Sequence, residues 1–242
     1  MEPWATSSTR TRSQFGSHGS GQARSFVMHY DVAKSSDADA VVRLLAQVFS
    51  EAEPPAVAMA LSAADLEQFL RLIVSSVVAD GLTVISRTAE TGGLTGVLFT
   101  DDFAKPPTLD VARITPKFLP ILSMLDRLDQ QFRKGKTISP GEYLHLFMLG
   151  VDRQFAGQGI GQQLIRACLD NGSRRGYRTA LTEATGRVSQ HIFRKNGFSD
   201  QFSVAYSTFT YENRLVFASI REHEGAILMG RSLACEAPKF KL

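Results

Sequence analysis

The sequence predicts a mixed α/β fold in which a twisted, mostly antiparallel sheet is flanked by helices. Apolar residues recur with helical spacing in some segments and form short β-rich runs in others, so both kinds of element are expected. A tight turn at residues 90–93 joins two of the β-rich runs into an antiparallel hairpin, which argues against a purely parallel sheet. The length of 242 residues and the hydrophobic share of 43% fit one large domain or two small ones.

The first half of the body is expected to hold one strand, two helices and the hairpin. Ser35 and Ser36 offer N-caps for a helix that runs through Phe49, and the prolines within residues 51–56 end it. Ser62 caps the next helix, whose apolar residues follow at helical spacing. The strands expected in this half are 26–33, 82–88 and 94–103.

Residues 104–141 interrupt the pattern with a further helix that starts at Thr115 and Pro116. The segment is too short to hold its own core, so we expect a helical insertion that covers the rest of one domain. The later elements expected are strands at 143–151, 178–182, 202–211, 215–220 and 226–233, and helices that end at Gly176 and at Gly197.

The first 25 residues are expected to form a disordered tail, so that residues 26–242 make up a single domain. Nine of these residues are Ser or Thr and the apolar ones are isolated, so the segment cannot bury enough surface to order itself. Without an apolar stretch it is not a secretory signal, and a cytoplasmic location is expected. The segment contains three arginines and one acidic residue, a composition that resembles an organelle-targeting peptide, so an organelle address is the alternative.

Composition excludes several classes of protein. No run of 18 apolar residues exists, so neither a transmembrane helix nor a membrane partner is expected. Two cysteines cannot make a disulfide framework, and with five scattered histidines they give no zinc spacing, so no metal is expected. A net charge of +3 over this length is too mild to favour nucleic acid over an acidic small molecule.

The most informative stretch is a glycine-rich segment, which follows a strand and opens a helix. It reads Val-Asp-Arg-Gln-Phe-Ala-Gly-Gln-Gly-Ile-Gly over residues 151–161. Glycines let the backbone approach a ligand closely, and the free N–H groups of the helix start favour an anion there. Phosphate or pyrophosphate is the expected ligand, and a glycine-rich turn without a ligand is the alternative.

Two phosphate-binding motifs fit this stretch poorly. A P-loop needs Lys followed by Ser or Thr after its last glycine, where this chain has Gln162 and Gln163. A dinucleotide-binding fingerprint needs its third glycine at position 162 and normally opens its domain. Glu183 could stand for the acid of that fingerprint, but the motif arrives here only after 150 residues.

A third motif fits better. The segment 156–161 resembles the pyrophosphate loop of the GNAT superfamily of acyl-CoA-dependent N-acetyltransferases, and Ser-Gln-His-Ile-Phe-Arg-Lys-Asn-Gly-Phe over residues 189–198 resembles a second motif of that superfamily. The order of elements from Phe26 to Leu233 matches as well. The resemblance implies a GNAT-like fold, with the helical insertion placed before the central strand, and acetyl-CoA as co-substrate. The cofactor-binding residues that it implies are Leu149, Gly150, Val151, Ala156, Gly157, Gln158, Gly159, Ile160, Gly161, Gln162 and Ser189.

The chain departs from the superfamily pattern at two positions. Ala156 replaces the usual Arg or Gln, which removes one side-chain contact to the pyrophosphate, and Arg153 is a candidate to compensate. Phe193 stands where many members have the Tyr that protonates the leaving thiolate, so any general acid must come from elsewhere.

Within the superfamily, the chain resembles arylalkylamine N-acetyltransferases, especially the insect dopamine-acetylating kind. Glu53 followed by Pro54 matches their Glu-Pro after the first helix and is the implied general base, with a solvated loop carboxylate as the alternative. Thr185 and Ser189 match their two hydroxyl residues, although Ser189 could also serve only as a helix cap. His145 on the central strand is a second candidate base. His191 is expected on the surface and Cys168 in the core.

These observations predict an acyl-CoA-dependent N-acetyltransferase. We expect it to move an acetyl group from acetyl-CoA to a primary amine, a small arylalkylamine, by direct transfer in a ternary complex. The chain is expected to act as a monomer or homodimer, without nucleic acid. A protein or peptide N-acetyltransferase and a non-catalytic acyl-CoA-binding module are the alternatives.

Overall fold

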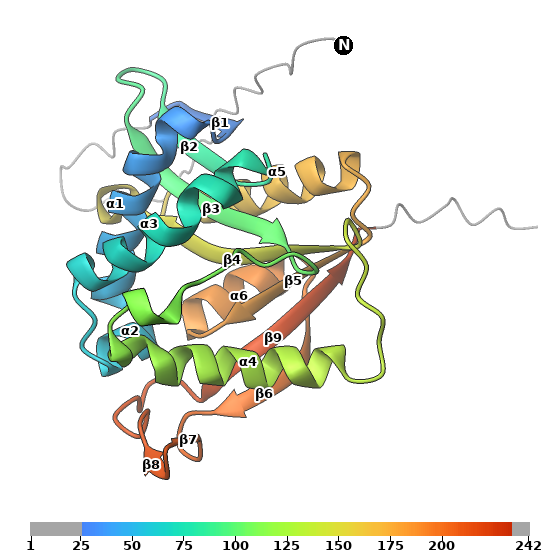
Figure 1. Cartoon of the computed structure of the whole chain (residues 1–242). Helices are drawn as coiled ribbons and strands as arrows, with labels where there is room; N and C mark the ends of the chain where they lie inside the picture. Colours follow the sequence, from blue (N-terminus) through green and yellow to red (C-terminus); the bar gives the residue numbers. More distant parts are fainter. Residues whose placement is uncertain (1–25, 234–242) are drawn as a thin grey trace, which may run out of the picture.

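A computed structural model describes residues 26–233 of the chain. The expected N-terminal tail lies outside the described residues. The mixed α/β fold is confirmed, because a seven-stranded, mostly antiparallel sheet is flanked by helices (Figure 1). The strands of this sheet are β1 (Met28–Val32), β2 (Val84–Thr88), β3 (Leu94–Asp102), β4 (Tyr143–Val151), β5 (Thr179–Ala184), β6 (Ser199–Ala205) and β9 (Gly225–Ser232). The helices are α1 (Ala38–Ala52), α2 (Pro54–Ala58), α3 (Ala63–Ala79), α4 (Leu119–Arg133), α5 (Ile160–Arg174) and α6 (Arg187–Lys195).

The strands are arranged in the order β1-β2-β3-β4-β5-β9-β6. Among the described strands, β4 and β5 alone pair in parallel, and that pairing covers only Tyr143, Leu144 and His145 of β4. Beyond this point the two strands separate, while β4 stays paired with β3 as far as Val151. The sheet therefore contains a fork between β4 and β5.

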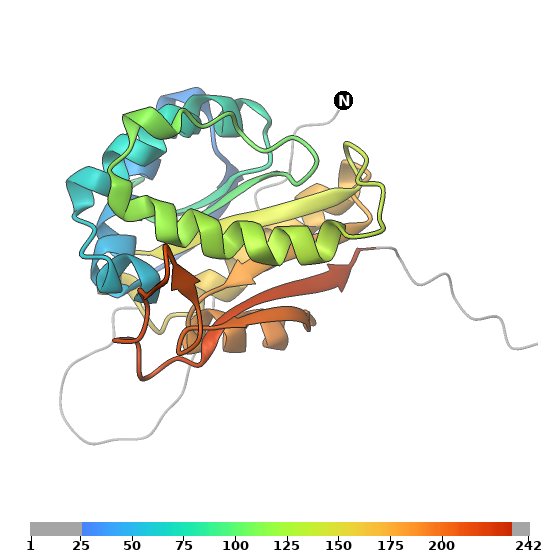
Figure 2. The ribbon, with the colours of Figure 1, turned by 60° about the horizontal axis from the view of Figure 1, so that its bottom comes forward.

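Two hydrophobic cores cover the two faces of the sheet. Helices α1, α3 and α4 pack on one face, and α5 and α6 pack on the other (Figure 2). Strand β4 serves both cores because its side chains alternate: Leu144 and Leu146 face α5, while Tyr143 and Phe147 pack against the other core.

The predicted insertion contains α4, preceded by a 3₁₀ turn at Pro116–Phe118. Met124, Leu128 and Phe132 repeat at helical spacing and are buried, so α4 lays an apolar stripe on the sheet next to β6 and β9. Its packing supports the expectation of a covering insertion.

Sequence expectations were wrong at several places. Ser35 and Ser36 do not cap α1, because they lie in a 3₁₀ turn, Ser35–Asp37, and the N-cap of α1 is Asp37. Pro54 and Pro55 were expected only to end the first helix. They also form the first turn of a further short helix, α2, where a backbone N–H would have no helical partner and its absence costs nothing. Residues 202–211 and 215–220 are not two long strands: β6 ends at Ala205, and a two-stranded ribbon of β7 (Thr210–Tyr211) and β8 (Arg214–Leu215) follows. Three aromatic side chains of this region are fully buried although its backbone leaves the main sheet, which explains the strand-like pattern; they belong to Tyr206, Phe209 and Phe217.

Candidate active site

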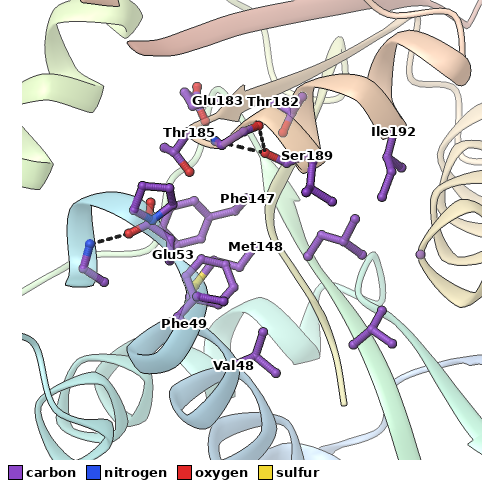
Figure 3. A pocket seen from close by; sticks show the side chains of 18 of the residues that line it. Val48, Phe49, Glu53, Phe147, Met148, Thr182, Glu183, Thr185, Ser189 and Ile192 are labelled. Atoms are coloured by element: carbon purple, nitrogen blue, oxygen red, sulfur yellow. Dashed lines mark hydrogen bonds between the residues drawn. The ribbon is translucent and has the colours of Figure 1, made fainter. Parts of the chain in front are cut away.

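A cavity of about 540 Å³ opens at the fork between β4 and β5. Its walls come from the end of α1, from α2, α3 and the start of α4, from the second half of β4, and from α6 (Figure 3). Part of the wall is aromatic, with Phe49, Phe69, Phe118 and Phe147. Glycine-loop residues and the residues that follow β5 line the same cavity. The fold thus places both sequence motifs around one space.

The glycine loop adopts the conformation that its sequence favours. Gly157 and Gly159 have φ values of +77° and +78°, in the left-handed region that residues with a side chain rarely adopt. Gly159 is the N-cap of α5, so the first N–H groups of that helix lie at the cavity wall. The loop is anchored from behind by Asp152, whose N–H donates to the Thr95 carbonyl and whose carboxylate accepts from the Gln154 N–H.

Most of the predicted cofactor residues line the cavity, namely Leu149, Val151, Ala156, Gly157, Gly159, Ile160, Gly161, Gln162 and Ser189. Gly150 and Gln158 do not line it. Gly150 faces α1, where an added Cβ would meet Leu45 at 2.9 Å. Arg153 lies in a separate groove with Arg43 and Glu51, so its side chain does not replace the missing one at Ala156 inside this cavity.

Glu53 is positioned by the Glu-Pro-Pro sequence itself. Pro54 and Pro55 have no N–H, so the first free donor of α2 is the Ala56 N–H, which donates to the Glu53 carboxylate. The Thr185 side chain also forms a hydrogen bond with Glu53. Burial raises the pKa of Glu53 to about 7, although these two hydrogen bonds lower it. Glu53 is therefore not a solvated loop carboxylate, whereas its neighbour Glu51 is exposed.

The start of α6 holds Thr185 and Ser189 next to Glu53. Helix α6 begins at Arg187, earlier than the sequence suggested, so Ser189 is the third residue of the helix and not its N-cap. Its hydroxyl donates to the Gly186 carbonyl at 2.9 Å and accepts from the Gly186 N–H at 3.2 Å (Figure 3). This pair of bonds ties the serine to the helix start at the cavity wall.

Two residues that the sequence analysis did not single out support this corner. Tyr206 is fully buried, and its hydroxyl donates to the Thr185 carbonyl at 2.6 Å. His223 lines the cavity, and its Nδ1 accepts the Arg187 N–H at 3.1 Å, so the proton of the neutral ring is on Nε2. Both come from the irregular region between β6 and β9, where no motif marks them.

Phe193 leaves no hydroxyl at the position of the usual tyrosine. Its ring is buried against Phe198 at a centroid distance of 5.1 Å. The expectations for two other residues are confirmed. His191 is exposed, and Cys168 is buried in the core, where burial raises the pKa of its thiol to about 12.

His145 is held on both sides by carboxylates. Its Nδ1 lies 2.8 Å from Asp101 and its Nε2 lies 2.7 Å from Glu183. Burial lowers the pKa of His145, but the negative charges of Glu183 and Asp101 outweigh it and raise the pKa well above its ordinary value. With both nitrogens donating, the ring is an imidazolium and has no lone pair to accept a proton from an amine.

Comparison with known proteins agrees with this geometry. Residues 124–198, which include the glycine loop and α6, match the model of the acetyltransferase (GNAT) family. The chain carries a GNAT acetyltransferase domain. This GNAT enzyme shares its fold with an arylalkylamine N-acetyltransferase 2 from Aedes aegypti at a TM-score of 0.71 and 22% identity, covering 86% of this chain and 99% of that one.

Two further structures resemble the GNAT enzyme in fold. The C-terminal condensation domain of Ebony, in complex with beta-alanyl-dopamine, superimposes with a TM-score of 0.79 at 14% identity, over 86% of this chain and 99% of that one. A polyamine N-acetyltransferase from Drosophila melanogaster, which catalyses the formation of N-acetylagmatine, gives 0.65 at 19% identity, over 85% and 99%.

Neither metal ligands nor membrane spans are evident in the described part of the enzyme. Within residues 26–233, no group of three or more His, Cys, Asp or Glu side chains is arranged to hold a metal ion. None of the helices in that range is long and apolar enough to cross a bilayer.

Proposed function

We propose that this GNAT enzyme transfers the acetyl group of acetyl-CoA directly to a small primary amine in a ternary complex, within one domain of residues 26–242. The observation that carries the proposal is the Glu53 carboxylate, buried in the wall of the cavity that the glycine loop also lines. One space thus holds an anion-binding loop and a base.

The co-substrate is expected to bind along the fork. The free N–H groups at the start of α5, which follow Gly157 and Gly159 in the chain, can donate hydrogen bonds to the negatively charged pyrophosphate. Beyond His145, the edge of β4 that faces β5 is open, so the backbone over residues 149–151 can pair with the extended pantetheine arm. A backbone N–H of this segment would polarise the thioester carbonyl.

Glu53 is the proposed general base. The amino group of an alkylamine has a pKa of about 10, so the acceptor arrives protonated at neutral pH and must lose a proton before it attacks. An ordinary Glu, with a pKa near 4.3, is a weak base at that pH. A pKa of about 7 makes the Glu53 carboxylate far better matched to the proton transfer.

Thr185 and Ser189 complete the proposed catalytic group. Thr185 orients the Glu53 carboxylate, and the Ser189 hydroxyl is the proposed hydrogen-bond donor to the leaving thiolate, since Phe193 has none to offer. In the structure this hydroxyl donates to the Gly186 carbonyl, so it would turn toward the sulfur when the thiolate forms.

The cavity wall suggests the class of acceptor. Four phenylalanines line the space on the α1, α3, α4 and β4 side, and flat apolar surfaces of this kind favour an arylalkylamine body by stacking and burial. The relatives named above for arylalkylamine and polyamine acetylation have the same fold, which agrees with a small amine acceptor.

The test is thiol release from acetyl-CoA with a panel of primary amines. Replacing the base, Glu53→Gln, keeps the shape of the side chain and should lower kcat by about 10²–10⁴-fold at neutral pH, because the amine must then deprotonate without help. Acetyl-CoA affinity measured by calorimetry should change little. Raising the pH should partly restore the rate, because more of the amine is already neutral.

Glu51→Gln is the matched control, since Glu51 is exposed two residues away and does not line the cavity. Its rate should equal that of the wild type. Near wild-type turnover of Glu53→Gln between pH 6 and 9 would remove Glu53 from the mechanism. Tight acetyl-CoA binding without turnover of any amine or lysine peptide would instead indicate a binding module.

A further inference from the structure

Side chains from two directions anchor the junction between β5 and α6, residues 184–187. From α6, the Gln190 side-chain amide donates to the Ala184 carbonyl at 3.1 Å. From the segment that follows β6, the Tyr206 hydroxyl donates to the Thr185 carbonyl at 2.6 Å. Both donor side chains are buried, so water does not compete for these carbonyls.

These two hydrogen bonds hold the two peptide units that flank the Thr185 Cα atom. The Ala184 carbonyl belongs to the unit before that atom and the Thr185 carbonyl to the unit after it. Each unit is planar, so holding both carbonyls sets φ and ψ of Thr185 and with them the direction of its Cα–Cβ bond. The Thr185 side chain is thereby directed toward Glu53, with which it forms a hydrogen bond (Figure 3).

Tyr206 is suited to be a permanent donor at this junction. Its ring packs edge-on against Phe217 at a centroid distance of 5.7 Å, and its backbone N–H donates to the Glu224 carbonyl at 3.0 Å, so the side chain has little freedom. Burial, followed by the negative charge of Glu53, raises the pKa of Tyr206. The hydroxyl therefore keeps its proton in any ordinary assay, and it lies close enough to Glu53 for the two groups to interact.

We propose that Tyr206 is a positioning residue of the acetyl transfer, which holds the Thr185 hydroxyl on the Glu53 carboxylate by binding the Thr185 carbonyl. Gln190 acts in the same way on the preceding peptide. Tyr206 does not line the cavity, so it acts through Thr185 and does not touch the substrate. This inference rests on the proposed function, because it concerns the base named there.

The bond from Thr185 favours the ionised form of Glu53, which is the form that accepts a proton. It lowers a pKa that burial raises to about 7. The second donor to this carboxylate is the Ala56 N–H. When Thr185 turns away, the carboxylate loses one of these two donors and its pKa rises further. Glu53 is then protonated, and inactive as a base, over more of the neutral range.

Other titratable side chains near Glu53 do not obscure this effect. They are Glu183 and His223 on the cavity wall, Tyr206 behind it, and the exposed Glu51 on α1. The variants below leave all of these in place except Tyr206, which carries no charge. A change in the titration of Glu53 therefore reports a change in its hydrogen bonds.

The experiment compares the pH dependence of kcat/KM for the fastest amine of the panel, at saturating acetyl-CoA, between wild type and Tyr206→Phe. The variant removes only the hydroxyl. Loss of one hydrogen bond to a charged carboxylate should move the acid limb up by about one pH unit, so the rate falls about tenfold at pH 6 and little at pH 9. Titration of the amine itself is common to both enzymes. The control Tyr211→Phe removes a hydroxyl from β7, away from the cavity wall, and should keep the wild-type profile.

Thr185→Val tests whether Tyr206 acts through this residue. It keeps the carbonyl that Tyr206 binds and removes the hydroxyl that bonds to Glu53, so its acid limb should also move up by about one pH unit. In the double variant with Tyr206→Phe the limb should move no further, although Tm falls. Gln190→Met frees the Ala184 carbonyl and should move the limb in the same direction, which keeps the inference testable if Tyr206→Phe does not fold.

Failure of this inference differs from failure of the proposed function. Infrared titration of the Glu53 carboxyl band, taken as the difference from Glu53→Gln, gives the same pKa without turnover. A lower Tm for Tyr206→Phe with an unchanged limb and an unchanged band would overturn the proposal, because Tyr206 would then only support the fold. A further shift in the double variant would also overturn it. If no amine releases thiol from acetyl-CoA, the acetyl transfer is wrong, while the band still decides whether Tyr206 controls Glu53.

Discussion

Glu53 and His145 are both largely buried titratable residues of this acetyltransferase, and their hydrogen bonds give them opposite roles. The Glu53 carboxylate has few donors around it, so burial raises its pKa into the range of a useful base. The His145 ring lies between two carboxylates, so it stays protonated and binds three strands together. The sequence offered both as candidate bases, and only the partners of each side chain separate them.

His145 is predicted to stabilise the fold rather than to take part in proton transfer. Removing one partner of a buried ion pair costs about 3–5 kcal/mol, so His145→Gln should lower Tm substantially. Because the pKa of His145 is raised, its stabilisation is fully present below the unfolded pKa near 6.5 and is lost as pH rises through the higher folded value. The Tm difference from wild type should therefore shrink at alkaline pH.

Thermal unfolding of wild type, His145→Gln and His191→Gln over a pH series checks this. His191 is exposed, so its variant should match the wild type throughout. A Tm difference for His145→Gln that grows toward high pH would contradict an imidazolium at this site.

The glycine loop and α5 form the element that the sequence predicted best. Local backbone rules alone require glycine at 157 and 159, because both residues adopt the left-handed conformation. The region between β6 and β9 was predicted worst. Its aromatic residues alternate like those of a strand, yet they are buried by contacts with one another across a non-regular backbone, as in the stacked rings of Phe209 and Phe217.

Gly159→Asp is predicted to abolish tight acetyl-CoA binding without unfolding the enzyme. The variant places a negative charge toward the pyrophosphate, and like charges in contact cost several kcal/mol, so affinity should fall about a hundredfold or more. Gly135→Asp is the matched control. It has the same left-handed backbone, with φ of +74°, in the connection between α4 and β4, where an added Cβ also meets nothing within 4 Å.

Two measurements on both variants test this prediction: CoA affinity by titration calorimetry, and Tm by thermal unfolding. The backbone strain should lower Tm equally in the two, while only Gly159→Asp should lose CoA affinity. Unchanged CoA binding by that variant would refute the assignment of the loop to pyrophosphate.

At the scale of the whole molecule, the sheet separates two cores, and the insertion belongs to one of them. Helix α4 buries Met124, Leu128 and Phe132 on the same core as α1 and α3, and its first turn lines the cavity with Ile121 and Leu122. The helix therefore contributes to stability and to the cavity wall at once.

Leu128→Ala is predicted to destabilise the whole protein in a single transition. Leu128 is fully buried, and truncation of such a leucine costs about 2–5 kcal/mol. Calorimetry should show one peak at a lower Tm, because α4 has no core apart from the sheet. A separate low-temperature transition for the insertion would show that it folds as an independent unit.

The sequence alone determined what depends on neighbours in the chain. It predicted the α/β class, the hairpin and the glycine loop, because turns and caps act over a few residues. The tertiary structure decided what depends on residues far apart: that Glu53 and Thr185 meet, that Asp101 and Glu183 hold His145, and that Tyr206 and His223 support α6. The pKa values that separate a base from a structural cation arise from burial and charge, and neither exists until the strands and helices pack together.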